Sequence, residues 1–392
     1  MSPRYDKPDL PPATVVGVMS GTSLDGVDTV TARLERVGGA LRWEVIARAA
    51  HVYPDALAAR LHAALKPESS DVILLTELHQ EVGLFYAEVV AAAQARDRVD
   101  LVALSGQTVY HIPRVEPERG WHVKSTLQLG EATVVTERCR VTTVSDFRQS
   151  DFSAGGQGAP LVSFPDSVLY AAPGVSRAVI NLGGIANVTY LPASGDPDGV
   201  LAFDTGPATC LLNEAAARFA GEPFDRDGRL ALAGTVDGLA LERLLADPYF
   251  ALRPPKTTGR EHFHLDAALA RGWPDGAPDL PDLMATLAEL TVRTVADGLA
   301  DHLTPLGVDE VLVAGGGARN PALLEGLRRA MSAPVRGFAE LGFDDKDRET
   351  LAMAVMGYFC VHGEPNVLPS ATGARWPVVA GKVSRPWSGR TG

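Results

Sequence analysis

The chain has 392 residues, enough for two domains that each bury a sizeable core. Its hydrophobic fraction of 46% and charged fraction of 21% are ordinary for a globular protein, and no apolar run approaches the roughly 18–20 residues of a membrane-spanning helix. The net charge of −12 disfavours a general nucleic-acid-binding role, which needs a basic face. Residues 1–12 are polar and proline-rich and lack the apolar centre of a signal peptide, and three widely spaced cysteines suit a reducing compartment. We therefore expect a disordered leader over residues 1–12 and a cytoplasmic protein that binds neither membranes nor nucleic acid.

The first half of the chain opens with three strand-like segments joined by short turns, which predicts an antiparallel meander. Helical and strand patterns then alternate. The predicted elements are strands at 14–19, 27–34, 41–50, 100–104 and 140–144 and helices at 55–65, 71–96 and 131–138.

The second half restarts the same pattern near Ser176, again with three short strands before the first helix. Its predicted elements are strands at 177–182, 187–191, 200–203 and 310–313 and helices at 208–219, 236–245, 283–303, 321–331 and 347–361. From residue 371 onward we expect a loop with a short strand.

Both halves carry a glycine-containing turn between their first and second strands. This matched placement favours a duplicated α/β domain over two unrelated ones, with helices covering the sheets. Such a duplication would place two glycine hairpins face to face across an interdomain cleft, as in the actin-like ATPases and sugar kinases. We expect one lobe over 1–144 plus 368–392 and the other over 145–367.

The first glycine hairpin (Gly21–Asp28) lies in VVGVMSGTSLDGVD, where an apolar strand breaks into small and hydroxyl residues. Free backbone N–H groups in such a turn can converge on a phosphate, although Gly, Ser and Asp also dominate ordinary turns. The second glycine hairpin (Gly183–Gly184) follows a buried strand in NLGGIANV and has the same two readings.

Asp204 lies at the end of the third strand of the second half, in FDTGP. A carboxylate there can act as a general base in the cleft. The alternative is that Asp204 or Thr205 caps the helix that follows.

Three further segments carry polar or glycine-rich patterns. Gly315-Gly316-Gly317 stands between a buried strand and a helix and allows a flat ligand to approach the backbone. Arg148 could hold a substrate carboxylate or pair with Asp146. The basic segment 254–261 fits a lid, a substrate contact or a subunit contact, and the His262–His264 pair lacks an evident third metal ligand.

Taken together, these segments resemble the anhydro-N-acetylmuramic acid kinase family along nearly the whole chain. The matching motifs are GVMSGTSLDGVD, SGQTVYH, TLQLGEA, SDFRQSDFSAGGQGAPL, NLGGIANVTYL, FDTGP, DPYF, PPKTTGRE, TLAELT, AGGGARNP and ATGA. The resemblance implies a duplicated actin/hexokinase-like (ribonuclease H-like) α/β fold and a homodimer. It also implies an enzyme that uses ATP and Mg²⁺ to convert 1,6-anhydro-N-acetylmuramic acid to N-acetylmuramic acid 6-phosphate in cell-wall sugar recycling.

The resemblance also assigns roles to individual residues. Asp204 would be the general base that activates a water for attack on the anomeric carbon, while the bridging oxygen leaves toward the γ-phosphoryl group. ATP would be bound by Gly21, Thr22, Ser23, Leu24, Asp25, Gly26, Val27, Asp28, Gly183, Gly184, Gly315, Gly316 and Gly317. The sugar would contact Gln107, Asp146, Arg148 and Glu349. Asp25 and Asp28 are candidate Mg²⁺ ligands, with water supplying the remaining positions.

The chain departs from the family pattern at Ser105, where a histidine is usual, at Ala208-Thr209, where the family has Gly-Asn, and at Asn213, where an acid is common. These changes leave room for a kinase acting on a simpler 1,6-anhydrosugar such as levoglucosan. A non-sugar ATPase switch on the same fold is a third hypothesis.

Overall fold

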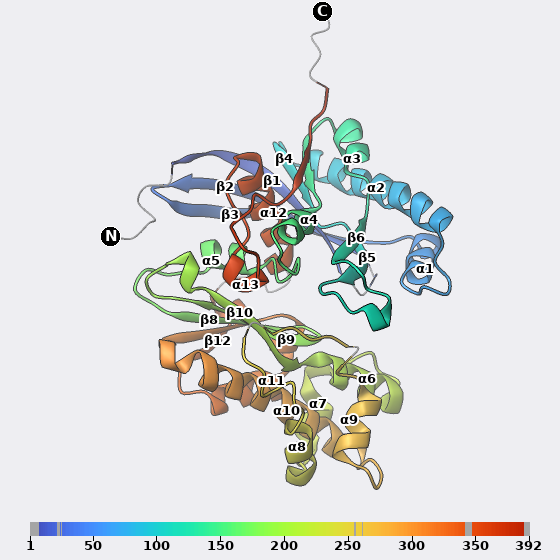
Figure 1. Ribbon diagram of the computed structural model, residues 1–392, viewed down its shortest axis with the longest axis vertical. Helices are drawn as coiled ribbons and strands as arrows, with labels where there is room; N and C mark the ends of the chain where they lie inside the picture. The colour runs from blue at the N-terminus through green and yellow to red at the C-terminus, as the bar shows by residue number, and fades with distance from the viewer. Residues whose placement is uncertain are drawn as a thin grey trace, which may run out of the picture. The chain divides into compact units, whose positions relative to one another are not determined.

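The computed structural model describes residues 8–21, 24, 26–254, 256–260, 262–341 and 347–387. It divides into two compact units: unit 1 comprises Met1–Tyr170 and Asp347–Gly392, and unit 2 comprises Ala171–Lys346. The two units are described separately below, and Figure 1 labels their elements.

Unit 1 is built on a sheet of six strands in the order β13-β7-β4-β1-β2-β3. β1, β2 and β3 form the predicted antiparallel meander, and β4 and β7 run parallel to β1. The strands are β1 (Leu10–Ser20), β2 (Gly26–Val37), β3 (Ala40–Val52), β4 (Leu101–Leu104), β7 (Thr142–Ser145) and β13 (Lys382–Ser384). Because β1 begins at Leu10, the prediction of a disordered leader through residue 12 was wrong for its last three residues.

The helices of unit 1 include those predicted at 55–65, 71–96, 131–138 and 347–361, while α4, α5 and α13 were not predicted. They are α1 (Asp55–Ala64), α2 (Val72–Gln94), α3 (Ala132–Cys139), α4 (Phe147–Ser153), α5 (Ser163–Leu169), α12 (Asp347–Val361) and α13 (Pro369–Thr372). A separate antiparallel hairpin, β5 (Gln107–Ile112) and β6 (Ser125–Leu129), was also not predicted.

Helix α12 is the central helix of unit 1 and packs on β1, β2 and β4 (Figure 1). Two glycines let it approach the sheet. A Cβ on Gly17 of β1 would lie 2.1 Å from the carbonyl oxygen of Thr350, and one on Gly357 would lie 2.6 Å from the Cβ of Ala103. Such distances are well inside van der Waals contact, so larger residues would force the helix off the strands.

The division into units differs from the predicted lobe boundaries at 144 and 367. Segments 145–170 and 347–367 both belong to unit 1, because α12 packs on its sheet and α5 packs on α12. Arg348 of α12 and Asp166 of α5 also form a buried two-point ion pair, with Nε donating to Oδ1 across 3.0 Å.

Unit 2 repeats the strand order of unit 1 in a sheet arranged β10-β9-β8-β11-β12. β8, β9 and β10 form an antiparallel meander, and β11 and β12 run parallel to β8. The strands are β8 (Arg177–Leu182), β9 (Ile185–Leu191), β10 (Leu201–Pro207), β11 (Glu310–Ala314) and β12 (Val335–Gly337). The shared order, three antiparallel strands followed by two parallel ones, confirms the duplicated actin/hexokinase-like α/β fold. The cleft between the lobes stays a prediction.

The helices of unit 2 share one hydrophobic core with its sheet. They are α6 (Thr209–Ala220), α7 (Arg229–Ala233), α8 (Gly238–Leu245), α9 (Leu265–Gly272), α10 (Leu280–His302) and α11 (Pro321–Ala330). Helix α10 is the longest of these; it packs on α6, α7, α8, α11 and β10.

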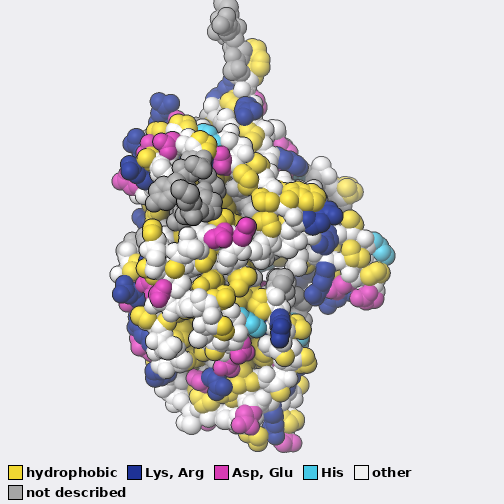
Figure 2. Space-filling model, turned by 60° about the vertical axis from the view of Figure 1, so that its left-hand side comes forward, with side chains coloured by type: hydrophobic (Ala, Val, Ile, Leu, Met, Phe, Trp, Pro, Cys, Tyr) yellow, Lys and Arg dark blue, Asp and Glu magenta, His cyan; other side chains and the backbone are white. Residues whose placement is uncertain are grey.

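The surface mixes charges of both signs. On the face drawn in Figure 2, described Lys and Arg side chains are interspersed with Asp and Glu. Among the described residues, no helix combines the length and the apolar character needed to cross a bilayer.

Candidate active site

The first glycine hairpin joins β1 to β2 in unit 1. Of its residues, Thr22, Ser23 and Asp25 lie outside the described part of the chain. Leu24 is buried in the core at 2% exposure with a left-handed backbone, φ 58°. Gly26 has φ 155°, and a Cβ there would lie 2.2 Å from the carbonyl oxygen of His51. A left-handed leucine is costly unless its surroundings hold it, so burial of Leu24 fixes the path of the turn.

The strand side of this hairpin is also fixed in place. Val27 is buried on β2, and Asp28 next to it is exposed. Gly21 directly follows β1, and its carbonyl oxygen accepts a hydrogen bond from Nε2 of Gln107 at 3.0 Å. On the β2 side of the hairpin, the Val27 side chain therefore faces the core and the Asp28 side chain faces solvent.

Gln107 is fully buried and belongs to a polar network beneath the hairpin. Its Oε1 accepts a hydrogen bond from the Tyr53 hydroxyl at 3.2 Å. The Tyr86 hydroxyl and the Ser20 Oγ form a second buried hydrogen bond, and burial raises the pKa of Tyr86 well above its usual value. The structure thus gives Gln107 a loop-holding role, while its contact with a sugar stays a prediction.

Ser105, where the family usually has histidine, lies at the same place. Its Oγ accepts a hydrogen bond from the backbone N–H of Ser20 at 3.0 Å and donates to the carbonyl of Gly106 at 3.2 Å. The residue at position 105 therefore helps to hold the end of β1, at Ser20, from which the chain enters the hairpin.

The second glycine hairpin joins β8 to β9 in unit 2 and receives the N-terminus of α6. Gly183 O accepts from the backbone N–H of Thr209 at 3.0 Å and from its hydroxyl at 2.9 Å. Gly184 O accepts from the N–H groups of Ala208 at 2.9 Å and Cys210 at 3.1 Å. The hairpin carbonyls thus satisfy donors that a helix N-terminus otherwise leaves unpaired.

Asp204 is half-buried on β10, at a β-bulge where the pairing with β9 shifts between Asp204 and Gly206. Its carboxylate oxygen Oδ2 accepts a hydrogen bond from the backbone N–H of Thr258 at 2.9 Å, and its own N–H donates to the carbonyl of Lys256 at 3.0 Å. Bulges commonly redirect side chains beside active sites. The alternative in which Asp204 caps α6 is not seen, since α6 has no side-chain cap.

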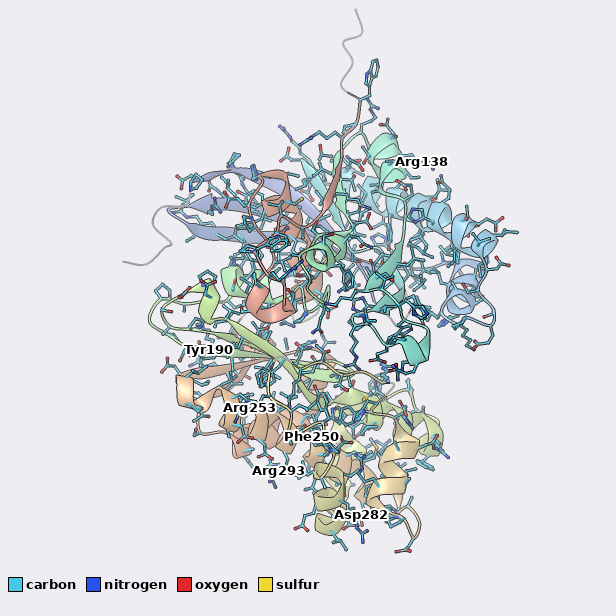
Figure 3. The ribbon with its side chains drawn as sticks, in the orientation of Figure 1. Arg138, Tyr190, Phe250, Arg253, Asp282 and Arg293 are labelled. Atoms are coloured by element: carbon cyan, nitrogen blue, oxygen red, sulfur yellow. The ribbon has the colours of Figure 1, made fainter. Side chains whose placement is uncertain are left out.

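Lys256 and Tyr249 hold the backbone of Asp204 in place. The Tyr249 hydroxyl donates to the backbone carbonyl of Asp204 at 2.9 Å. Lys256 is 7% exposed, its Nζ lies 4.9 Å from the centre of the Tyr249 ring, and it donates to the carbonyl of Phe250 at 3.2 Å. Burial lowers the pKa of Lys256, against the opposing effect of Asp301 and Asp204. Phe250 is labelled in Figure 3.

The three glycines Gly315, Gly316 and Gly317 have different environments. A Cβ on Gly315, where φ is 88°, would lie 2.6 Å from Oδ1 of Asn181, and one on Gly317 would lie 2.7 Å from the Cβ of Leu182. Gly316 has nothing within 4 Å of that position. Packing of the turn against the end of β8 therefore explains the outer two glycines, and only the central one faces open space.

A pocket of about 420 Å³ opens beside this turn, within the range of small-molecule sites. It lies entirely in unit 2. The residues around it are Thr209, Leu212, Asn213, Phe224, Asp225, Arg226, Asp227, Gly316, Gly317, Arg319 and Asn320. The Arg226 guanidinium stacks 5.2 Å from the centre of the Phe224 ring. Two of the departures from the family pattern, at Thr209 and Asn213, therefore line this pocket.

The four predicted sugar contacts are all in unit 1, and the structure gives them different partners. Asp146 starts α4 in a left-handed conformation and pairs with Lys382 at 3.0 Å. Arg148 donates instead to the carbonyl of Gly158 at 2.5 Å. Glu349 is exposed on α12 and acts electrostatically on Arg148. The alternative in which Arg148 pairs with Asp146 is therefore not seen: Asp146 pairs with Lys382, and Arg148 bonds to Gly158.

His111 on β5 lies beside Arg148 and was not singled out from the sequence. Burial, and then the positive charge of Arg148, lowers the pKa of His111 to about 4. Its Nδ1 lies 3.1 Å from Oγ1 of Thr126. A neutral histidine leaves the charge of Arg148 available for an anionic ligand.

His262 and His264 have structural roles in unit 2. Nε2 of His262 lies 3.2 Å from both carboxylate oxygens of Asp247, and His264 caps α9 by accepting from the N–H of Ala267. Among the described residues, no group of three or more His, Cys, Asp or Glu side chains could hold a metal ion.

Comparison with known proteins identifies relatives along almost the whole chain. The model of the anhydro-N-acetylmuramic acid kinase family matches residues 13–385. A curated anhydro-N-acetylmuramic acid kinase from Salinibacter ruber is 42% identical over 95% of this chain and 96% of its own length. One from Gloeobacter violaceus is also 42% identical, over 95% and 98%, and one from Streptomyces coelicolor is 41% identical, over 94% and 93%.

Solved structures align over most of the chain with low similarity. A ROK family glucokinase from Streptomyces griseus in complex with glucose and AMPPNP covers 88% of this chain and 99% of its own, with 13% identity and a TM-score of 0.38. That likeness says nothing about the substrate. The match to the family model and the identities above 40% show that this chain belongs to the anhydro-N-acetylmuramic acid kinase family.

Proposed function

We propose that this protein is an ATP-dependent kinase that converts 1,6-anhydro-N-acetylmuramic acid to N-acetylmuramic acid 6-phosphate, opening the 1,6-anhydro bridge with water. Membership of the family supports the reaction type. The structural observation that carries the proposal is Asp204, a half-buried carboxylate on a strand bulge, held by the backbone N–H of Thr258.

In the proposed reaction Asp204 takes a proton from water, and the water oxygen bonds to the anomeric carbon C1. The C1–O6 bond breaks and leaves its electron pair on O6. O6 then bonds to the γ-phosphorus of ATP while the bond from that phosphorus to the bridging β,γ oxygen breaks and ADP leaves. Sugar, water and ATP thus yield the 6-phosphate, ADP and one proton, which Asp204 releases to solvent. One base therefore serves two bond changes.

ATP is proposed to bind through the two glycine hairpins and the pocket beside Gly316. The hairpins offer small residues and backbone groups to phosphate oxygens, and the pocket accepts the adenosine. Mg²⁺ is proposed to enter with ATP and neutralise phosphate charge. Mg²⁺ keeps several waters and needs only one or two carboxylates, and Asp28 is the exposed carboxylate that the structure describes at the first hairpin.

The sugar is proposed to bind on unit 1 near Arg148. N-acetylmuramic acid carries a lactyl carboxylate, and a guanidinium binds a carboxylate through charge-assisted hydrogen bonds. Glu349, close enough to act on Arg148, is proposed to accept a hydrogen bond from a sugar hydroxyl, and Gln107 and Asp146 remain candidate contacts.

The departures from the family pattern do not gather at this sugar side. Ser105 bonds to Ser20 at the first hairpin, Ala208 and Thr209 bond to the second, and Asn213 lines the pocket. The positions of these four residues favour an effect on ATP binding. Because none of the four lies at the proposed sugar site, they give no reason to prefer a simpler 1,6-anhydrosugar as the substrate.

We also expect a cytoplasmic homodimer that acts in the recycling of cell-wall sugars, since ATP and a recovered sugar meet in the cytoplasm.

The proposed function is tested by a phosphorylation assay with 1,6-anhydro-N-acetylmuramic acid, levoglucosan and N-acetylmuramic acid, which lacks the 1,6-anhydro bridge. We expect turnover of the first, with product mass increased by one phosphoryl group and one water. Equal turnover of levoglucosan, or ATP binding without turnover of any sugar, would overturn the proposal.

A further inference from the structure

We propose that Arg260 binds the γ-phosphate of ATP at the second glycine hairpin and stabilises the transferring phosphoryl group. This inference rests on the proposed kinase function and adds a residue to its catalytic machinery. It concerns the part of the basic 254–261 segment for which the sequence left the role open.

The guanidinium of Arg260 lies directly over the hairpin. Its Nη2 would be 3.2 Å, and its Nε 3.3 Å, from a Cβ placed on Gly184. A side chain at position 184 would therefore compete with the guanidinium for the same space. The glycine permits this approach, and it leaves the edge of the guanidinium beside the turn proposed to bind phosphate.

The backbone that carries Arg260 is tied to the catalytic base. Within the loop Lys256–Arg260, the carbonyl of Lys256 and the N–H of Thr258 both bond to Asp204. One short loop therefore sets the position of the base and of the cation together. Positioning of this kind accounts for much of the rate in phosphoryl transfer, where little covalent work falls to the protein.

The side chain itself is available for a ligand. Arg260 is exposed, and none of the described residues forms a hydrogen bond or ion pair with its guanidinium. The other charged side chain on this loop is occupied: the ammonium of Lys256 is buried against Tyr249 and the carbonyl of Phe250.

Arg260 also lies beside the N-terminus of α6. α6 begins at this hairpin with three backbone N–H groups directed at the carbonyls of Gly183 and Gly184. Burial raises the pKa of Cys210 in the first turn of α6 to about 11, and the positive charge of Arg260 opposes that rise, so the two lie close together. A cation beside a helix N-terminus is unfavourable by itself. An anion bound by the guanidinium offsets that repulsion.

The γ-phosphate is the anion that this geometry fits. In phosphoryl transfer the O6–P bond forms and the P–O bond to ADP breaks, while negative charge spreads over the three non-bridging oxygens. An arginine donates N–H groups to such oxygens and keeps its proton throughout. Arg260 therefore acts by charge and hydrogen bonding, and Asp204 alone exchanges a proton.

The test compares Arg260→Ala and Arg260→Lys with the control Arg253→Ala. Arg253 is an exposed arginine on the segment that leads into the loop, and Figure 3 labels it. Each variant is measured for ATP and ADP affinity, kcat with the anhydrosugar, and thermal midpoint. We expect Arg260→Ala to lower kcat by about 10²–10³-fold and to weaken ATP at least about 10-fold more than ADP, with an unchanged thermal midpoint. Arg260→Lys should recover part of the loss, and Arg253→Ala should match the wild type.

The ADP comparison separates a phosphate contact from a structural role, because ADP lacks the γ-phosphate. Equal weakening of ATP and ADP, or a kcat for Arg260→Ala within about 3-fold of wild type, would overturn the inference. If the wild type bound ATP but phosphorylated no anhydrosugar, the proposed function would fail, while a selective loss of ATP affinity in Arg260→Ala would still support the phosphate contact.

Discussion

Nε2 of Gln107 donates a hydrogen bond to the backbone carbonyl of Gly21 across 3.0 Å. A fully buried side chain on β5 thereby holds the first residue of the first glycine hairpin. The opposite end of the same amide accepts from Tyr53, which orients it. A phosphate-binding turn needs fixed backbone groups, and this pair of hydrogen bonds is one source of that rigidity.

We predict that Gln107→Ala raises KM for ATP by about 10-fold. The change removes the hydrogen bonds that the amide makes with the Gly21 carbonyl and the Tyr53 hydroxyl. It leaves the Gly21 carbonyl without this donor, at a cost of about 1–3 kcal/mol. If Gln107 acts only by holding the hairpin, KM for the sugar should change less than about 2-fold; a direct contact with the sugar would raise that KM as well. Steady-state kinetics with each substrate varied in turn measures both values.

The control for this prediction is Gln128→Ala. Gln128 is also buried, on the neighbouring β6, but its amide bonds to Thr108 and Thr126 instead of the hairpin. A larger effect of Gln107→Ala on the sugar than on ATP would show that Gln107 is a sugar contact.

We predict that Asp204→Asn lowers kcat by about 10²–10⁴-fold, the usual contribution of a general base. The amide oxygen of asparagine can still accept from Thr258, so the bulge and ATP affinity should be retained. Asp198→Asn, on an exposed turn before β10, is the matched control. Retention of turnover in Asp204→Asn would refute the assignment of the base.

We predict opposite outcomes for two neighbouring glycines. Gly316→Ala places a methyl group in the open pocket and should raise KM for ATP by several-fold with little change in thermal midpoint. The Cβ of Gly317→Ala meets Leu182 at 2.7 Å and Thr209 at 3.1 Å. This change should therefore lower the free energy of unfolding by about 1–3 kcal/mol, as overpacking does, and lower the thermal midpoint with it. An unchanged KM for ATP in Gly316→Ala would argue that the nucleotide pocket lies elsewhere.

The duplicated fold was predictable because its signals are local. A strand, a glycine turn and a second strand recur at Gly21 and Gly183, and each hairpin has the predicted antiparallel pairing. Asp204 was singled out in the same way, as a carboxylate at the end of a strand predicted over 200–203. The strand in fact continues to Pro207, so Asp204 lies within it at a bulge, and its role as a base stays a prediction. Such signals depend on residues adjacent in sequence, which is where propensity and periodicity act.

The parts that were missed depend on contacts between distant residues. Nothing in the pattern around Arg348 shows that α12 returns to the first sheet and pairs with Asp166, so the lobe boundaries were misplaced. The hairpin of β5 and β6 has a 12-residue connection and lacks a short turn signal. Likewise, Thr258 and Arg260 lie in a segment without periodicity, and only the fold brings them to Asp204 and Gly184.

We predict that the free energy of unfolding decreases as the pH is lowered, partly because of His111. Its pKa is about 4 in the folded protein and about 6.5 in an unfolded chain. Between pH 6.5 and 4 the unfolded state therefore binds a proton that the folded state does not, so the free energy of unfolding decreases as pH falls through this window. The ring is partly exposed, and solvent screening limits the effect to about 1–2 kcal/mol.

The measurement is denaturant unfolding of the wild type and His111→Gln at pH 7.5 and pH 4.5. Burial also lowers the pKa of His51, His302 and His362, and these remain in both proteins, so the difference between the two isolates His111. The variant should lose less stability on acidification than the wild type. An identical loss would show that His111 titrates normally in the folded protein.

We predict that Arg148→Ala removes the preference for 1,6-anhydro-N-acetylmuramic acid over levoglucosan. Levoglucosan has no lactyl carboxylate, so losing the guanidinium should lower kcat/KM for the muramic sugar by about 10²-fold, as loss of a charge-assisted hydrogen bond implies, and spare levoglucosan. Arg148 also holds the carbonyl of Gly158, and a purely structural role would lower both activities alike. Arg138→Ala, an exposed arginine on α3 labelled in Figure 3, controls for the loss of a positive charge on the same unit. Because the comparison is a ratio between two substrates of one variant, it separates carboxylate recognition from a loosened loop even where the variant is less stable.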